Sequence, residues 1–182
     1  MNITIKPKML NGTLQKTENI DYYNPFLLGS AIGNIIRVID NENSPKPILN
    51  FISKIVSREV VFDLENNKNL ITYLMILGCN GCGKVVFNGI QNINQSIICE
   101  AVNILTSLGG KIVYENNSIT ITGTNGLKGG TIEKINDIDL LKGLIIQGAV
   151  LDDELTIKNI NNDTIKCFLN DFEYLGGKFE LN

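Results

Sequence analysis

The sequence predicts an α/β fold of the α+β class: a single domain in which strand-helix-strand-helix-strand units repeat around buried helices. Hydrophobic residues make up 43% of the 182 residues and charged residues 19%, a balance typical of a folded globular chain. Helical and strand periodicities alternate along the chain. Segment 69–90 also aligns without a gap with segment 139–160, and such self-similarity at a fixed spacing indicates an internal repeat.

The N-terminal part contains the faintest copy of this unit. Pro45 and Pro47 suit the start of a helix better than its interior, because proline lacks the backbone N–H that an interior position donates. The elements expected here are a strand at 10–14, an apolar stretch at 26–32, a strand at 34–39 and a helix at 45–56.

The middle of the chain carries the clearest signals. Apolar residues at helical spacing predict a helix over 69–78, and the β-branched and aromatic run after it predicts a strand over 83–90. A second helix is expected over 97–108, where Gly109 and Gly110 end the apolar periodicity.

A hairpin then closes the second unit, with strands at 111–114 and 118–122 around a turn at Asn116 and Asn117. The third unit repeats this order. Leu108-Gly-Gly-Lys111 corresponds to 175–178, and the final strand at 179–181 corresponds to 112–114.

We place the repeat units at 1–56, 57–126 and 127–182. One such unit cannot bury its own apolar faces, so the three must pack together. The sequence therefore predicts one cooperative domain spanning 1–182.

Composition excludes several classes of function. The net charge of -3 and a pI near 5.0 argue against a nucleic-acid partner, which requires clustered cations. Residues 1–14 contain no apolar run of signal-peptide length, and no later run approaches a membrane span, so we expect a cytoplasmic protein without a membrane partner. The chain has no histidine, which removes the commonest general base, the usual catalytic triad and most catalytic zinc sites.

The glycine-rich segment 78–84 imitates a phosphate-binding P-loop, in which backbone amides surround phosphate and a lysine neutralises it. Two features disagree with that motif. Val85 stands where a magnesium-binding Ser or Thr is needed, and the loop is predicted to leave a helix and enter a strand, the reverse of a P-loop. A glycine-rich turn is the better interpretation.

Four cysteines are present. Cys79 and Cys82 have the spacing of a redox pair or of half a zinc site, but a second such pair is missing. Cys99 and Cys167 fall on predicted apolar helix faces, where a buried thiol is expected. We therefore predict reduced thiols, no metal and no cofactor.

Three stretches carry a family resemblance. Segment 127–139, Leu-Lys-Gly-Gly-Thr-Ile-Glu-Lys-Ile-Asn-Asp-Ile-Asp, resembles the "LKGGTI…NDIPD" segment of EPSP synthase, the 3-phosphoshikimate 1-carboxyvinyltransferase. Segment 117–123 resembles the family's "NSITVTG", and 10–13 its "LNGT". The similarity in element order covers 59–182 together with the N-terminal strand. UDP-N-acetylglucosamine enolpyruvyl transferase shares the fold, but these motifs are closer to the EPSP branch.

The resemblance implies a transferase of the shikimate pathway, which serves aromatic amino acid biosynthesis. Six strand-helix units would be split between two domains, with phosphoenolpyruvate and shikimate 3-phosphate bound in the cleft between them. The present chain would correspond to one enolpyruvyl transferase-like domain.

The family's ligand-binding residues map poorly onto this sequence. The lysine of its "SKS" motif falls on Ile20, the next serine on Asp21 and the following arginine on Pro25. Its "RVKESDR" run falls near 160–164, which has no arginine. These changes replace an anion-binding cluster with apolar and acidic residues.

The catalytic aspartate that ends the "NDIPD" motif corresponds to Asp139, the single catalytic candidate. The alternative is that Asp139 only caps the helix starting at Leu140, as Asn69 would cap the equivalent helix. Lys128, Lys134 and Lys142 are expected to be solvated surface residues. The substrate-binding residues stay unassigned.

Three functions are compatible with these observations. The first is an EPSP synthase-like transferase, either a half-enzyme completed by a second chain or domain, or a degenerate homologue that lacks most substrate-binding residues; whether the chain catalyses alone is left open. The second is a non-catalytic interaction or scaffold module that forms a homodimer or binds a protein partner. The third is a small-anion binder that uses the turns at 109–110, 129–130 and 176–177.

Overall fold

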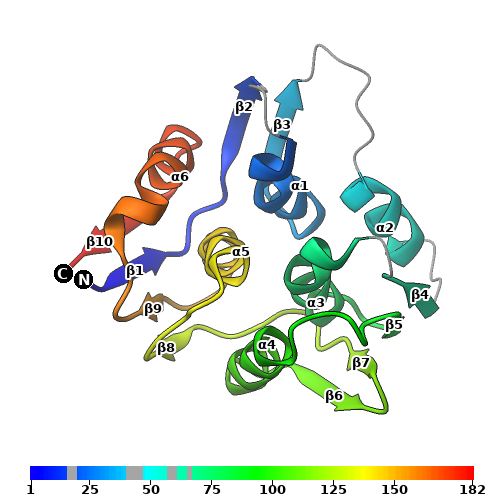
Figure 1. Cartoon of the computed structure of the whole chain (residues 1–182). Helices are drawn as coiled ribbons and strands as arrows, with labels where there is room; N and C mark the ends of the chain where they lie inside the picture. The colour runs from blue at the N-terminus through cyan, green and yellow to red at the C-terminus, as the bar shows by residue number, and fades with distance from the viewer. Residues whose placement is uncertain (16–19, 40–46, 57–60, 65–66) are drawn as a thin grey trace. The chain divides into compact units, whose positions relative to one another are not determined.

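The structure is a computed structural model that describes residues 1–15, 20–39, 47–56, 61–64 and 67–182 (Figure 1). Helices and strands alternate along the chain, so the predicted α/β class is confirmed. The chain divides into two compact units: residues 47–127 form one, and residues 1–46 together with 128–182 form the other. The single cooperative domain stays a prediction.

In the unit made from both ends of the chain, the described strands form two sheets. Its elements are β1 (Ile3–Lys6), β2 (Asn11–Gln15), α1 (Asn24–Ala31), β3 (Ile35–Ile39), β8 (Gly130–Ile132), α5 (Ile138–Gly148), β9 (Leu155–Ile157), α6 (Asn162–Tyr174) and β10 (Lys178–Leu181). In the larger sheet β1 lies antiparallel between β10 and β9, and β8 joins β9 in parallel. In the smaller sheet β2 and β3 are parallel.

Helices α1 and α5 are apolar on nearly all sides and form the core of this unit. Two glycines allow these helices to approach each other and the strands closely. A Cβ at Gly148 would lie 2.7 Å from Cγ2 of Ile5 on β1, and one at Gly29 would lie 2.8 Å from Cγ2 of Ile146 and 2.9 Å from Cδ1 of Ile36. Larger residues at these two positions would force the helices away from the sheets.

The described strands of the second unit form a four-stranded sheet in the order β4-β5-β7-β6. Its elements are α2 (Pro47–Val56), β4 (Val61–Asp63), α3 (Ile71–Asn80), β5 (Lys84–Asn88), α4 (Gln95–Ser107), β6 (Lys111–Glu115) and β7 (Ser118–Thr122). The side chains of α3 from Ile71 to Cys79 are all buried, which makes α3 the central helix of this unit. Residues 45 and 46 of the predicted 45–56 helix lie outside the described residues.

The predicted hairpin and glycine-rich turn are both present. Asn116 and Asn117 have φ values of 51° and 56°, the left-handed conformation that a two-residue hairpin loop requires. The glycine-rich loop leaves α3 and enters β5. Its carbonyls at Gly81 and Gly83 accept hydrogen bonds from the backbone N–H groups of Asn125 (3.1 Å) and Gly123 (2.7 Å), so the loop is a structural turn.

Among the described strands, three pairs are parallel: β2–β3, β4–β5 and β8–β9. The two strands of each pair are connected in sequence through α1, α3 and α5 respectively. This order of elements agrees with the sequence pattern. The equivalence of three units bounded at 1–56, 57–126 and 127–182 stays a prediction.

The expectation for two cysteines is wrong. Cys99 and Cys167 are exposed rather than buried. On α4 the buried side chains are Ile98, Ala101 and Leu105; because neighbouring residues on a helix are separated by about 100°, Cys99 is turned away from that stripe. Cys167 likewise precedes the buried Phe168.

Candidate functional site

Asp139 lies in the first turn of α5 and is half-buried. It is not the cap of this helix, which corrects the alternative offered from the sequence. Asp137 occupies the N-cap position, and its Oδ1 accepts a hydrogen bond of 2.6 Å from the backbone N–H of Leu140. The helix begins two residues earlier than the apolar pattern indicated, so the cap moves with it.

The equivalent expectation for Asn69 is also wrong. The N-cap residue of α3 is Leu70, which makes no side-chain capping hydrogen bond. Asn69 instead lies in a short 3-10 turn, Lys68–Leu70, that leads into the helix. The two helix starts therefore differ in how their first N–H groups are satisfied.

Three segments meet at the start of α1, just after the 3-10 turn Ile20–Tyr23. The Tyr22 hydroxyl donates a hydrogen bond of 2.6 Å to Oδ2 of Asp171 on α6. The ammonium group of Lys142, one turn after Asp139 on α5, lies 5.9 Å from the centroid of the Tyr22 ring, within the range of a cation–π interaction. The start of α1, the first turns of α5 and the side of α6 are thus neighbours.

Tyr22 stays a neutral phenol in this setting. Burial, followed by the hydrogen bond and the negative charge of Asp171, raises the pKa of Tyr22 above its ordinary value. The phenol is therefore a hydrogen-bond donor that orients the Asp171 carboxylate. It is a poor general base, because its basic form is disfavoured.

A cavity of about 600 Å³ adjoins these residues. Two of its lining residues are joined by a hydrogen bond of 2.9 Å, which the Tyr23 hydroxyl donates to the Gln15 carbonyl. The lining residues are Thr13, Leu14, Gln15, Tyr22, Tyr23, Ile39, Asp171 and Tyr174. One ionisable carboxylate and three phenols line the wall, so the cavity offers hydrogen-bond groups and negative charge rather than a cationic lining for phosphate.

The positions that correspond to the family's phosphate-binding residues also lack cationic side chains. Asp21 is exposed, and its Oδ1 accepts a hydrogen bond of 3.3 Å from the Asn24 side chain. Pro25 is buried in the first turn of α1. The carboxylates of Asp21, Asp139 and Asp171 outnumber the ammonium group of Lys142, and like charge disfavours a bound anion.

The other lysines singled out from the sequence, Lys128 and Lys134, are exposed, as expected. Lys142 differs, since it is half-buried and contacts Tyr22. Tyr22 and Asp171 were not among the residues indicated by the sequence. Their separation of 149 residues leaves no local pattern that could have indicated the pair.

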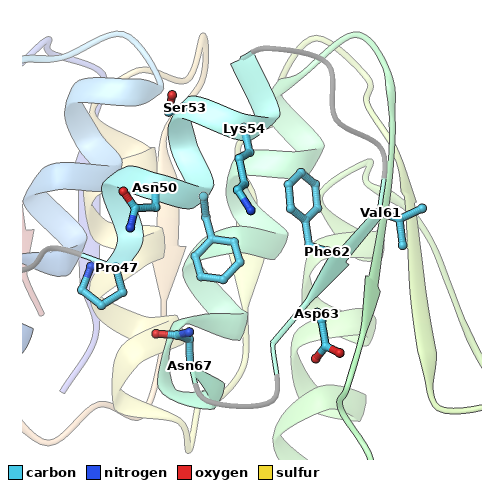
Figure 2. A pocket seen from close by; sticks show the side chains of 9 residues that line it. Pro47, Asn50, Ser53, Lys54, Val61, Phe62, Asp63 and Asn67 are labelled. Atoms are coloured by element: carbon cyan, nitrogen blue, oxygen red, sulfur yellow. The ribbon is translucent and has the colours of Figure 1, made fainter.

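A second cavity of about 530 Å³ lies in the unit 47–127, between α2 and β4. Figure 2 shows its lining side chains, which are Pro47, Asn50, Phe51, Ser53, Lys54, Val61, Phe62, Asp63 and Asn67. The rings of Phe51 and Phe62 meet edge to face with centroids 6.2 Å apart. Both rings are buried, whereas the other lining residues include the polar side chains of Asn50, Ser53, Lys54, Asp63 and Asn67.

Among the described residues, no group of three or more His, Cys, Asp or Glu side chains could hold a metal ion. Cys79 is buried and Cys82 is exposed, and burial raises the pKa of the Cys79 thiol to about 12. Such a thiol is unreactive near neutral pH. Among the described helices, none has the length and apolarity needed to span a bilayer.

Neither protein-family models nor curated protein sequences match this chain. Solved structures do. An EPSP synthase from Acinetobacter baumannii superposes with a TM-score of 0.69 at 13% identity over 95% of this chain, and a second structure of EPSP synthase from that organism gives 0.68 at 12% over 94%. The enolpyruvyl transferase NikO from Streptomyces tendae gives 0.55 at 15% over 68%.

The fold is therefore that of the enolpyruvyl transferases. The chain spans about half the length of the EPSP synthases it matches, 48% in each case, and 29% of NikO. This is the extent expected for one of the two domains that the sequence resemblance implied. At these identities the likeness concerns the fold, and the activity must be argued from the site.

Proposed function

We propose that this chain is a degenerate relative of EPSP synthase, which keeps the domain scaffold but not the binding of shikimate 3-phosphate and phosphoenolpyruvate, and serves as an interaction module. One observation carries the proposal. The start of α1, where the resemblance places a lysine, a serine and an arginine, has Ile20, Asp21 and Pro25. Two phosphates and two carboxylates would meet acidic and apolar groups there.

The free energy of binding a charged substrate also supports the loss of substrate binding. Binding a multiply charged substrate costs several kcal/mol in desolvation and lost freedom, and charge-assisted hydrogen bonds from Arg and Lys normally offset that cost. At this site Asp171 is held by Tyr22, and Lys142 is already placed over the Tyr22 ring. A phosphate would have to compete for Lys142 while lying near carboxylates.

A second candidate is a half-enzyme completed by another chain or domain, with Asp139 transferring a proton. The position of Asp139 favours it, because the residue is half-buried in the first turn of α5, with Lys142 one turn along. In this case the missing cations would come from the completing chain, and Asp139 would act only in the assembled cleft.

Thermal melting tests whether this chain by itself binds either substrate. The chain is melted alone, with each substrate, and with both, beside Asp139→Ala. A ligand at a hundred times its Kd would add about 2.7 kcal/mol of stability, a rise of roughly 5–10 °C for a chain of this length. We expect no shift in wild type.

A positive control restores the family residues. The double substitution Ile20→Lys with Asp21→Ser reintroduces the lysine and serine at the start of α1. If the scaffold is retained and only the cations are lost, phosphoenolpyruvate should stabilise this variant more than wild type. A rise of several degrees in wild type that Asp139→Ala abolishes would instead show substrate binding that depends on Asp139, and would defeat the proposal.

A further inference from the structure

The smaller sheet is incomplete by comparison with the other two. In both four-stranded sheets, the second strand of the parallel pair has an antiparallel neighbour on its far side: β5 pairs with β7, and β9 pairs with β1. The corresponding strand of the smaller sheet is β3, and within the described residues it pairs with β2 alone. A two-stranded parallel sheet is unusual, since such strands are normally buried in larger sheets.

The backbone groups on the open side of β3 can be identified. The N–H of Ile35 donates 2.9 Å to the carbonyl of Leu10, toward β2. Because hydrogen-bonding direction alternates along a strand, Ile35, Arg37 and Ile39 face β2, whereas the N–H and C=O groups of Ile36 and Val38 point away from it. The Ser30 hydroxyl donates to the Ile36 carbonyl at 2.8 Å, which leaves that oxygen a second lone pair.

Side chains on β3 also divide into two rows. Ile36 is buried and Val38 half-buried on the side covered by α1, whereas Ile35 is 61% and Ile39 43% exposed on the outer side, with Arg37 between them. Across β2, Arg37 faces the neutral Thr13. No ion pair joins Arg37 to a described carboxylate.

We propose that this edge of β3 binds an extended segment of a partner protein as an antiparallel strand, with a carboxylate opposite Arg37 and β-branched apolar residues on either side of that carboxylate. The two complete sheets indicate the form of the occupant. There the antiparallel neighbours β7 and β1 present isoleucines to the core side, at Ile119 and Ile121 and at Ile3 and Ile5.

Charge complementarity with Arg37 determines the central residue of the partner segment. Arg37 would occupy a non-hydrogen-bonded pair, in which opposite side chains are closest, so an acidic residue across from it forms a cross-strand ion pair. A second copy of β3 fits less well, because pairing Ile35 with Ile39 of the copy would place Arg37 opposite Arg37. The recognition motif is therefore apolar-acidic-apolar in an extended segment, bound by strand addition.

This inference goes beyond the proposed function, because a catalytic and a non-catalytic domain would present the same edge. Its test uses peptides and amide NMR on the whole chain. The probe is acetyl-Ser-Thr-Val-Glu-Ile-Thr-Ser-amide. In the proposed pairing the Val and Ile amides face β3 and the Glu amide faces away, so N-methylation at Val should abolish binding while N-methylation at Glu should not.

Four results would support the proposal. The Glu peptide shifts the amide signals of Ile36 and Val38. Replacing its Glu by Lys weakens binding roughly three- to tenfold, because an attractive cross-strand pair becomes a repulsive one. In the Arg37→Glu variant, the Lys peptide binds more tightly than the Glu peptide. Val38→Pro, which removes an edge N–H at a position where an edge strand tolerates proline, weakens both peptides, with unchanged melting as the folding control.

Three results would overturn the proposal. One is that no peptide perturbs the Ile36 and Val38 amides at millimolar concentration. Another is that N-methylation at Val and at Glu has the same effect, which would exclude strand pairing. The last is concentration-dependent self-association by light scattering that protects these amides, which would give the edge to a second copy.

Discussion

Replacing Asp137 by alanine tests whether α5 is capped where the structure places the cap. The substitution removes the 2.6 Å hydrogen bond from the Leu140 N–H to Oδ1. Losing an N-cap side chain typically costs about 1 kcal/mol, within a range of roughly 0.5–2. For a chain of this length, each kcal/mol lowers the Tm by about 2–4 °C.

Asp139→Ala is the matched comparison, since it removes a carboxylate two residues away within the same helix turn. A carboxylate in the first turn contributes about 0.3–1 kcal/mol through the helix dipole. Alanine returns up to roughly 0.7 kcal/mol through its higher helix propensity. The expected net change is therefore smaller than for Asp137→Ala.

Urea unfolding followed by circular dichroism measures both variants, and Asp137→Ser, which keeps a capping oxygen, should recover most of the lost stability. The capping role of Asp137 is refuted if Asp139→Ala costs as much as Asp137→Ala, or if Asp137→Ser is no better than Asp137→Ala.

Three further predictions concern packing, the site and the thiols. Gly123→Ala should lower the free energy of unfolding by an amount near the top of the roughly 1–3 kcal/mol overpacking range, because its Cβ would overlap the Gly81 carbonyl. Gly83→Ala has nothing within 4 Å of its Cβ and should change the free energy of unfolding by less than about 0.5 kcal/mol. Equal effects of the two substitutions would contradict the turn geometry. A double-mutant cycle of Tyr22→Phe and Asp171→Asn should give a coupling near 1 kcal/mol, low for a charged hydrogen bond because the pair is half-exposed, and a coupling of zero would show that the two side chains act independently. Thiol titration at pH 8 should label three cysteines fast and Cys79 only on unfolding. Burial raises the Cys79 pKa from 9.0 to about 12, so the folded state keeps the thiol proton to a higher pH than the unfolded state does. The free energy of unfolding should therefore fall as the pH rises from 9 toward 12.

The sequence by itself determined the local elements. The helix at 69–78 is found at Ile71–Asn80, the strand at 10–14 at Asn11–Gln15, and the hairpin turn at the two asparagines with positive φ. Each depends on side-chain periodicity or on the backbone preference of a few adjacent residues, which any sequence displays directly. The glycine-rich turn was predictable for the same reason.

The tertiary structure alone decided what lies far apart in sequence or depends on a shift of one or two residues. Tyr22 contacts Asp171 and Lys142 only because the fold brings α1, α5 and α6 together. The cap of α5 is Asp137 and not Asp139, and Cys99 and Cys167 are exposed. A helix that starts two residues earlier has a different N-cap residue, and apolar periodicity fixes a helix start only within a few residues. Which side chains meet is set by packing among distant segments, and that information is spread over the whole chain.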